Sequence, residues 1–130
     1  MRMTINRSMT NISSDNLKKS KTFYTTLFDF DIAFDSDWFV QLVSQGNQLE
    51  LGFVDRKHEI VPEAFQQMPA GFYITFVVED VSPIFEKAKE FGFSVIQEPH
   101  DTFYGQRRLL LKDPDGTLID VSAPIKNFQF

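Results

Sequence analysis

The 130-residue sequence contains no cysteine, only two histidines and a single tryptophan. Without cysteine the protein has no disulfide framework, no thiolate nucleophile and no cysteine-ligated metal site. His58 and His100 stand in polar segments that we expect to be exposed loops. A catalytic role stays open for His100, because imidazole titrates near neutral pH.

Long apolar runs are also missing. No stretch approaches the ~18 apolar residues of a membrane span, and the N-terminus lacks the apolar core of a signal peptide. We therefore expect a cytoplasmic protein that does not bind membranes. Basic residues are few, because 13 Lys and Arg face 18 Asp and Glu and the net charge is −5. This balance argues against nucleic acid as a partner.

Phenylalanine, by contrast, is abundant, with 15 copies in the chain. A chain of this length fits one domain with a usable core. So many large apolar rings imply a thick core, an apolar cavity wall or an apolar interface. Because an uncovered apolar edge is uncommon on a monomer, we expect a homodimer.

Hydrophobic periodicity predicts the same order of elements twice, at about 4–54 and 72–123. In the first module we expect a strand at 4–12, a helix capped by Ser14 or Asp15, and strands at 30–35, 38–44 and 48–54. In the second we expect a strand at 72–79, a helix with Ser82 as N-cap that stops at Gly92, and strands at 93–98, 104–112 and 117–123. A connector at 55–71, with one short helical turn, joins the two modules into a single domain, 1–130.

Strand alternation places two carboxylates on one side of the predicted strands. Asp120 faces away from Ile119, and Glu50 faces away from Leu49. We expect the apolar faces to meet the helices and the mixed faces to form a concave surface suited to a binding site. The turn at 113–116, with sequence DPDG, has the composition of a hairpin turn and needs no further role.

The repeated strand–helix–three-strand order resembles the vicinal oxygen chelate superfamily, which includes glyoxalases, bleomycin-resistance proteins, fosfomycin-resistance enzymes and extradiol dioxygenases. The resemblance rests on the segment DNLKKSKTFYTTLFDFDI, the DPDG turn and the ID dipeptide that follows it. It implies an α+β fold in which two βαβββ modules form a concave mixed β-sheet with helices on the outer face. It names no single chemistry, because this fold serves many.

Metal-using members of that superfamily carry two histidines and two glutamates as ligands, and these positions correspond here to Met9, Glu50, Tyr73 and Asp120. Both histidine positions are therefore replaced. Zinc, nickel and iron prefer imidazole, which neither a thioether nor a phenol replaces well. We expect no cofactor, and a divalent ion such as magnesium on the two carboxylates is the alternative.

Two carboxylates without a metal need a hydrogen-bond donor, a shared proton or a cation. Arg107, Arg108 and Tyr73 are candidate donors, and a cationic ligand is the other solution. Aromatic faces attract cations, which brings Trp38 and Tyr104 into the predicted site. The full predicted ligand-binding set is Met9, Asn11, Trp38, Glu50, Tyr73, Thr75, Tyr104, Arg107, Arg108 and Asp120.

Three functions stay open at this point. The first is a metal-free binding protein for a small organic molecule, similar to the bleomycin-resistance branch, whose acidic and aromatic pocket sequesters a drug. The second is a metal-dependent lyase, isomerase or dioxygenase that uses Glu50 and Asp120. The third is a non-metal acid–base enzyme, for which Glu50, Tyr73 and Asp120 are the candidate catalytic residues.

Overall fold

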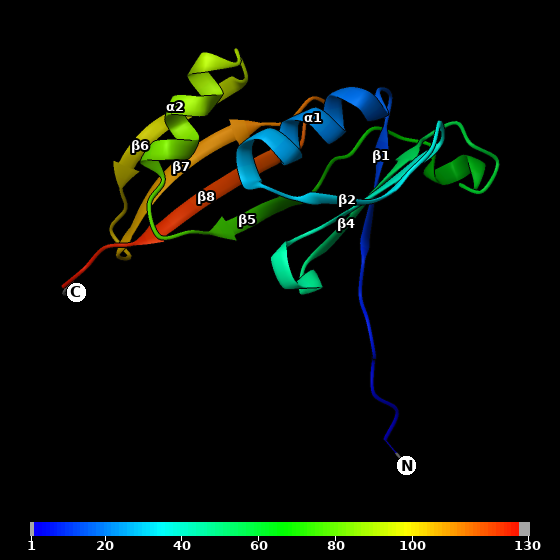
Figure 1. Ribbon diagram of the computed structural model, residues 1–130, viewed down its shortest axis with the longest axis horizontal. Coiled ribbons are helices and arrows are strands. Elements are labelled where there is room, and N and C mark those ends of the chain that lie inside the picture. Colours follow the sequence, from blue (N-terminus) through cyan, green and yellow to red (C-terminus); the bar gives the residue numbers. More distant parts are fainter. Residues whose placement is uncertain (1, 128–130) are drawn as a thin grey trace.

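The computed structural model describes residues 2–127 as an α+β protein (Figure 1). Its first half contains β1 (Thr10–Ser14), α1 (Leu17–Phe28), β2 (Asp31–Asp35), β3 (Phe39–Val43), the short 3-10 helix η1 (Gln45–Asn47) and β4 (Glu50–Asp55). After a second 3-10 helix, η2 (Glu63–Phe65), come β5 (Tyr73–Val77), α2 (Ser82–Glu90), β6 (Ser94–Asp101), β7 (Gln106–Lys112) and β8 (Leu118–Pro124). The predicted order of strand, helix and three strands occurs twice, which confirms the predicted fold class.

Each module has its own four-stranded mixed sheet, with the orders β1-β4-β3-β2 and β5-β8-β7-β6. In both sheets the first strand pairs in parallel with the last strand, and the remaining pairs are antiparallel. The two sheets therefore have the same topology, and β1 and β5 occupy equivalent edge positions.

No helix within residues 2–127 is long and apolar enough to cross a membrane.

The two helices lie on the same side of the sheets, and the N-terminal segment leaves on the other side (Figure 1). One apolar core contains residues of both modules. Phe23 and Tyr24 of α1 are fully buried in it, and the ring of Phe23 makes an edge contact with Phe93 of the second module, with 5.1 Å between ring centroids. The first helix thus joins the modules into one packed unit.

The turn 113–116 also joins the modules. Its two aspartates are buried and bind side chains of α1: the Tyr24 hydroxyl donates to Asp113 and the Ser20 hydroxyl donates to Asp115, both at 2.6 Å. Burial raises the pKa of the Asp113 carboxyl and of the Tyr24 phenol. We call Ser20, Tyr24, Asp113 and Asp115 the inter-module clamp. We expected 113–116 to be only a hairpin turn, but this turn also holds the two modules together.

The strand faces agree with the prediction except at the start of β4. Ile119 and Phe53 are fully buried in the core, and Leu51 of β4 is buried beside them. Leu49, which we expected on the same apolar face, is 55% exposed, because it precedes β4, which begins at Glu50 and not at residue 48 as expected.

Three expected boundaries are also wrong. The first strand begins at Thr10 rather than near residue 4. The N-cap of α1 is Asn16, whose side chain accepts a hydrogen bond from the Lys19 amide at 3.0 Å. Ser82 is the first residue of α2 instead of its N-cap, and the Asp80 side chain accepts the Ser82 amide at 2.9 Å.

Candidate functional site

On the face of the first sheet opposite the core, the side chains of Asn11 and Phe39 lie over Gly52 of β4. A β-carbon at Gly52 would lie 2.2 Å from the Asn11 side-chain oxygen and 2.9 Å from the Phe39 ring. The missing side chain therefore makes room for an amide from β1 and an aromatic ring from β3 directly over the strand. This arrangement forms the floor of a pocket.

The pocket has a volume of about 540 Å³ and is built from β1, β3, β4 and the connector. We call it the aromatic pocket, and its lining residues are Met9, Asn11, Ser13, Trp38, Phe39, Val54, Ile60, Val61, Pro62 and Phe65. None of these side chains is charged. Three of the predicted ligand-binding residues, Met9, Asn11 and Trp38, line this pocket.

The connector forms one wall of the aromatic pocket and is held in place by its own contacts. The His58 ring stacks on the Trp38 ring, with 4.3 Å between centroids and 19° between planes. Gln66 donates to the Val61 carbonyl at 2.9 Å, and Arg56 forms an ion pair with Asp15. His58 does lie in a loop, but the expectation that it is exposed is wrong, because its ring is partly buried against Trp38. The expected loop position of His100 is also wrong, because His100 lies in β6. The periodicity of the sequence does not indicate that the connector forms a pocket wall.

Glu50, the first of the two carboxylates, is bound by an arginine. The Nε of Arg7 donates to Glu50 Oε2 at 2.7 Å, and the Nη2 donates to Oε1. Gln41 Nε2 adds a hydrogen bond to Oε1 at 2.9 Å. The Arg7 guanidinium holds the pKa of the Glu50 carboxyl below its ordinary value. Sequence reasoning missed Arg7, because it assigned residues 4–12 to a strand and sought donors only near the second module.

Asp120, the second carboxylate, is buried and has three side-chain donors. Thr75 donates to Oδ2 at 2.9 Å, and Ser122 donates to Oδ1 at 2.8 Å. Arg108, one of the predicted donors, donates from Nε to Oδ1 at 3.1 Å. Asp120 pairs with Thr75 in the parallel register of β5 and β8, whereas Tyr73 pairs with Leu118.

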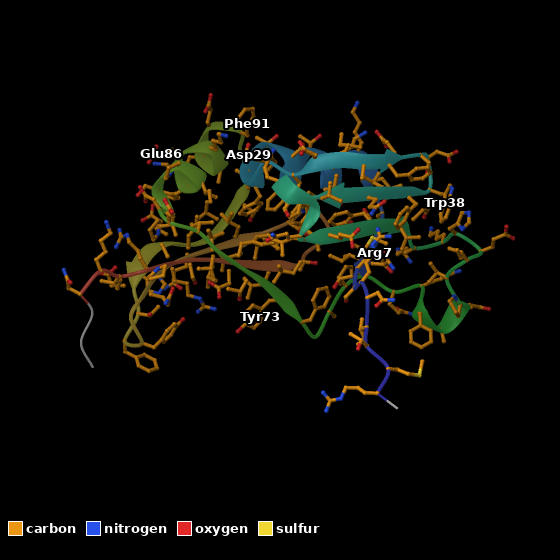
Figure 2. The ribbon with its side chains drawn as sticks, turned by 60° about the horizontal axis from the view of Figure 1, so that its bottom comes forward. Arg7, Asp29, Trp38, Tyr73, Glu86 and Phe91 are labelled. Carbon is orange, nitrogen blue, oxygen red and sulfur yellow. The ribbon has the colours of Figure 1, made fainter. Side chains whose placement is uncertain are left out.

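The other predicted site residues lie apart from these contacts. Tyr73 projects outward from β5 (Figure 2) and is 54% exposed. Tyr104 lies between β6 and β7 and contacts Phe103 edge to face. Arg107 forms an ion pair with Asp101 at 2.9 Å, and it lies on the face of β7 opposite Arg108 because neighbouring strand residues alternate.

The structure therefore describes two carboxylate clusters with different partners. Glu50 is bound by Arg7 and Gln41, whereas Asp120 is bound by Thr75, Arg108 and Ser122. The four positions that the family resemblance would assign to metal ligands thus offer a thioether, a phenol and two carboxylates that already accept guanidinium groups. This donor set does not fit zinc, nickel or iron, which prefer imidazole or thiolate. Within residues 2–127, no group of three or more His, Asp or Glu side chains is arranged to hold a metal ion.

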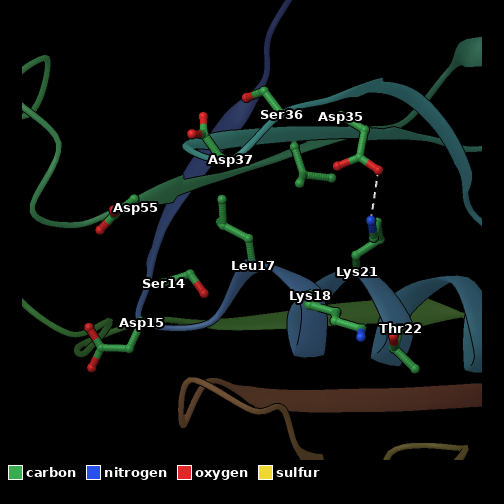
Figure 3. A pocket seen from close by; sticks show the side chains of 11 residues that line it. Ser14, Asp15, Leu17, Lys18, Lys21, Thr22, Asp35, Ser36, Asp37 and Asp55 are labelled. Atoms are coloured by element: carbon green, nitrogen blue, oxygen red, sulfur yellow. Dashed lines mark hydrogen bonds and ion pairs between the residues drawn. The ribbon is translucent and has the colours of Figure 1, made fainter.

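A second pocket lies between α1 and the turn that joins β2 and β3 (Figure 3). It has a volume of about 440 Å³ and a lining that includes Lys18, Lys21, Asp15, Asp35, Asp37 and Asp55. Lys21 and Asp35 form an ion pair across it at 2.7 Å. Charges of both signs line this groove, so it has no clear preference for one ligand class.

The profile of the Glyoxalase/Bleomycin resistance protein/Dioxygenase superfamily matches residues 6–121. The chain belongs to this superfamily. The match includes both modules and the connector, so the superfamily assignment rests on nearly the whole chain. It confirms the family resemblance that the element order and the DPDG and ID motifs predicted.

Several solved structures share the fold of this chain. A glyoxalase/bleomycin resistance protein/dioxygenase family enzyme from Burkholderia phytofirmans PsJN is 23% identical, with a TM-score of 0.78 over 91% of this chain and 98% of that chain. A glyoxalase-related enzyme from Fulvimarina pelagi is 18% identical, with a TM-score of 0.77 over 92% and 88%. A hypothetical protein from S. aureus is 26% identical, with a TM-score of 0.76 over 93% and 95%. The curated proteins contain no sequence match to this chain.

Proposed function

We propose that this superfamily member binds a small organic molecule in the aromatic pocket without a metal ion. The observation that carries the proposal is a pocket of about 540 Å³ with aromatic, aliphatic and amide side chains in its lining. Such pockets, apolar with a few polar groups, are typical of small-molecule sites. The amide of Asn11 and the hydroxyl of Ser13 are the polar groups that would orient the ligand.

The expected selectivity is for an uncharged aromatic or aliphatic molecule. The carboxylates that would attract a cation are Glu50 and Asp120, and each already accepts hydrogen bonds from an arginine. A ligand cation would have to displace a guanidinium to reach either of them. The resemblance to bleomycin-resistance proteins suggests drug sequestration, and we propose it here for uncharged molecules.

The two enzymatic alternatives receive less support. A metal-dependent lyase, isomerase or dioxygenase needs about three good ligands and an open position, and the thioether, phenol and paired carboxylates do not supply them. An acid–base enzyme needs a carboxylate or phenol within reach of a bound substrate. Glu50, Tyr73 and Asp120 do not line the aromatic pocket.

We also propose that the protein is a homodimer. Tyr73 and Val77 of the edge strand β5 are exposed, as is Phe72 just before the strand. An unpaired strand edge with apolar side chains is a surface that another chain can pair with. Light scattering is expected to give a mass of twice the 15.1 kDa of one chain, and a monomer at micromolar concentration would contradict the homodimer.

The proposed ligand pocket can be tested through its own fluorophore, because Trp38 is the only tryptophan. We expect 3-phenylpropan-1-ol to change the Trp38 emission and 3-phenylpropan-1-amine, which has the same body and a positive charge, to bind more weakly. Replacing Phe65→Ala removes an exposed part of the pocket wall. This variant should bind the alcohol about threefold to tenfold more weakly, because less apolar surface is buried.

Phe91→Ala is the matched control, since Phe91 is also exposed but lies at the end of α2, outside the pocket lining. It should bind the alcohol as the parent does. Equal losses in the two variants would show that the emission change does not report the aromatic pocket. Tighter binding of the amine than of the alcohol would contradict the proposed selectivity.

A further inference from the structure

Polar side chains from all four strands of the second sheet meet on the face opposite the core. Asp120 and Ser122 lie on β8, and Thr75 of β5 is the register partner of Asp120. Arg108 of β7 pairs with Ser122, and His100 of β6 pairs with Arg108. Directly opposite residues share a face, with β-carbons about 4.5–5.5 Å apart. The imidazole and the guanidinium are therefore neighbours.

Arg108 is held so that its outer end is available. Its Nε donates to Asp120, and Asp120 is itself fixed by Thr75 and Ser122. The Asp120 side chain is 9% exposed and that of Arg108 is 23% exposed. Within residues 2–127 the terminal amino groups of Arg108 have no acceptor among the hydrogen bonds of the structure. A guanidinium presents these groups as a planar fork that matches two oxygens of one anion.

Two side chains, His100 and Gln106, lie beside the Arg108 guanidinium. The Nδ1 of His100 lies 3.2 Å from the Glu98 carbonyl oxygen, which only accepts, so Nδ1 donates to it and the ring is held beside Arg108. The other ring nitrogen of the neutral imidazole is an acceptor, so His100 adjoins the anion site and reports on it but does not donate to the anion. Gln106 lies two residues from Arg108 on the same face of β7, and its amide nitrogen is the side-chain atom that can donate to an anion, because the amide oxygen only accepts.

We propose that Arg108, with His100 and Gln106 beside it, forms a binding site for an oxyanion of the carboxylate or phosphate class. Asp120 is a positioning residue, because it acts on the ligand only through the orientation of the Arg108 guanidinium. The site goes beyond the proposed small-molecule function, since it lies on the second module and shares no residue with the aromatic pocket. The charges of Arg108 and Asp120 cancel, so recognition of the anion depends on the geometry of the guanidinium fork.

The chain has two histidines, which makes the site directly observable by NMR. His100 stands beside Arg108, and His58 stacks on Trp38 in the other module. We expect inorganic phosphate and acetate, titrated separately at constant ionic strength, to shift the imidazole resonances of His100 saturably. The resonances of His58 and the emission of Trp38 should stay unchanged. The His100 resonances are assigned with the His100→Gln variant.

Arg108→Gln and Arg107→Gln form a matched pair, because the two arginines are adjacent on β7 and each binds an aspartate. The Arg108→Gln variant should lose the saturable shift, with at least a tenfold weaker apparent affinity, whereas Arg107→Gln should keep it. Arg108→Lys retains the charge but not the fork, and it should also weaken binding. The NMR spectrum of Arg108→Lys shows whether this variant is folded.

Several results would overturn the oxyanion site. Equal losses in the two glutamine variants, or parallel shifts of His58 and His100, would show a non-specific ionic effect only. If Arg108→Lys bound the anion as tightly as the parent, a positive charge alone would explain the binding. The proposed role of the guanidinium fork would then be wrong. Failure of the Trp38 titration with 3-phenylpropan-1-ol would contradict the aromatic pocket but leave the oxyanion site standing.

Discussion

At the scale of single residues, the most informative position is one without a side chain. Gly52 lies on β4, and its missing β-carbon is what allows Asn11 and Phe39 to meet above the strand. The glycine has no left-handed φ angle, so close approach rather than backbone conformation explains it. A glycine inside a strand often marks such an approach.

Replacing Gly52→Ala is expected to close the aromatic pocket in part. The new β-carbon would lie 2.9 Å from the Phe39 ring, so the ring must shift, and overpacking of this kind costs about 1–3 kcal/mol. We expect a lower free energy of unfolding in urea and weaker binding of 3-phenylpropan-1-ol. The double variant with Asn11→Ala should regain part of the stability, because it removes the nearest clash. An unchanged affinity in Gly52→Ala would contradict the assigned pocket floor.

At the scale of elements, the N-terminal segment before β1 is held to the sheet by one ion pair. Arg7 is the partner of Glu50, and Figure 2 shows it where this segment reaches the sheet. The pKa of Glu50 is lowered by the Arg7 hydrogen bonds. A carboxyl whose folded pKa is depressed stabilises the fold above its unfolded pKa and loses this contribution as the pH falls through the folded pKa.

The stabilisation by Arg7 should therefore disappear in acid. We expect the parent to melt at a higher temperature than Arg7→Gln at pH 7, and the difference to shrink below the ordinary Glu50 pKa of 4.5. Arg2→Gln is the control, because Arg2 is an exposed arginine of the same segment. It should melt like the parent at both pH values. A difference between the parent and Arg7→Gln that is as large at pH 2.5 as at pH 7 would contradict the ion pair as its source.

The helices and strands could be predicted from the sequence wherever a short-range pattern determines their faces or their ends. Alternation fixed the faces of β8, and Pro83 with Gly92 located α2 to within two residues. The start of β1 is misplaced because residues 4–9 alternate as a strand does, although no strand within residues 2–127 pairs with them. The aromatic pocket could be predicted only through Met9, Asn11 and Trp38, since its other wall comes from the connector, whose position depends on tertiary contacts.

At the scale of the whole molecule, the inter-module clamp explains why the serine, the tyrosine and the DPDG turn occur together. Ser20 and Tyr24 of the first module bind Asp115 and Asp113 of the second. These hydrogen bonds are buried, and an unmade buried hydrogen bond costs more than a formed one contributes. The motifs that indicated the family therefore form contacts that hold the two modules of this chain together.

Removal of one clamp hydroxyl should weaken the entire domain. We expect Tyr24→Phe to lower the free energy of unfolding by about 1–3 kcal/mol, because the buried Asp113 carboxylate loses a donor. Urea unfolding followed by Trp38 emission and by circular dichroism measures this loss. Tyr104→Phe, at a partly exposed tyrosine, should change stability by less than about 0.5 kcal/mol. Equal stabilities of the two variants would contradict the clamp.

The central claim is that arginines, and not a metal ion, are the partners of the two carboxylates on the faces opposite the core. Elemental analysis of protein that is purified without chelator, incubated with Zn, Fe, Ni and Mn salts and then dialysed tests this claim most directly. We predict less than one tenth of an equivalent of each metal in the parent and in Asp120→Asn. One equivalent of any of these metals in the parent, lost in Asp120→Asn, would contradict the claim and identify a metalloenzyme.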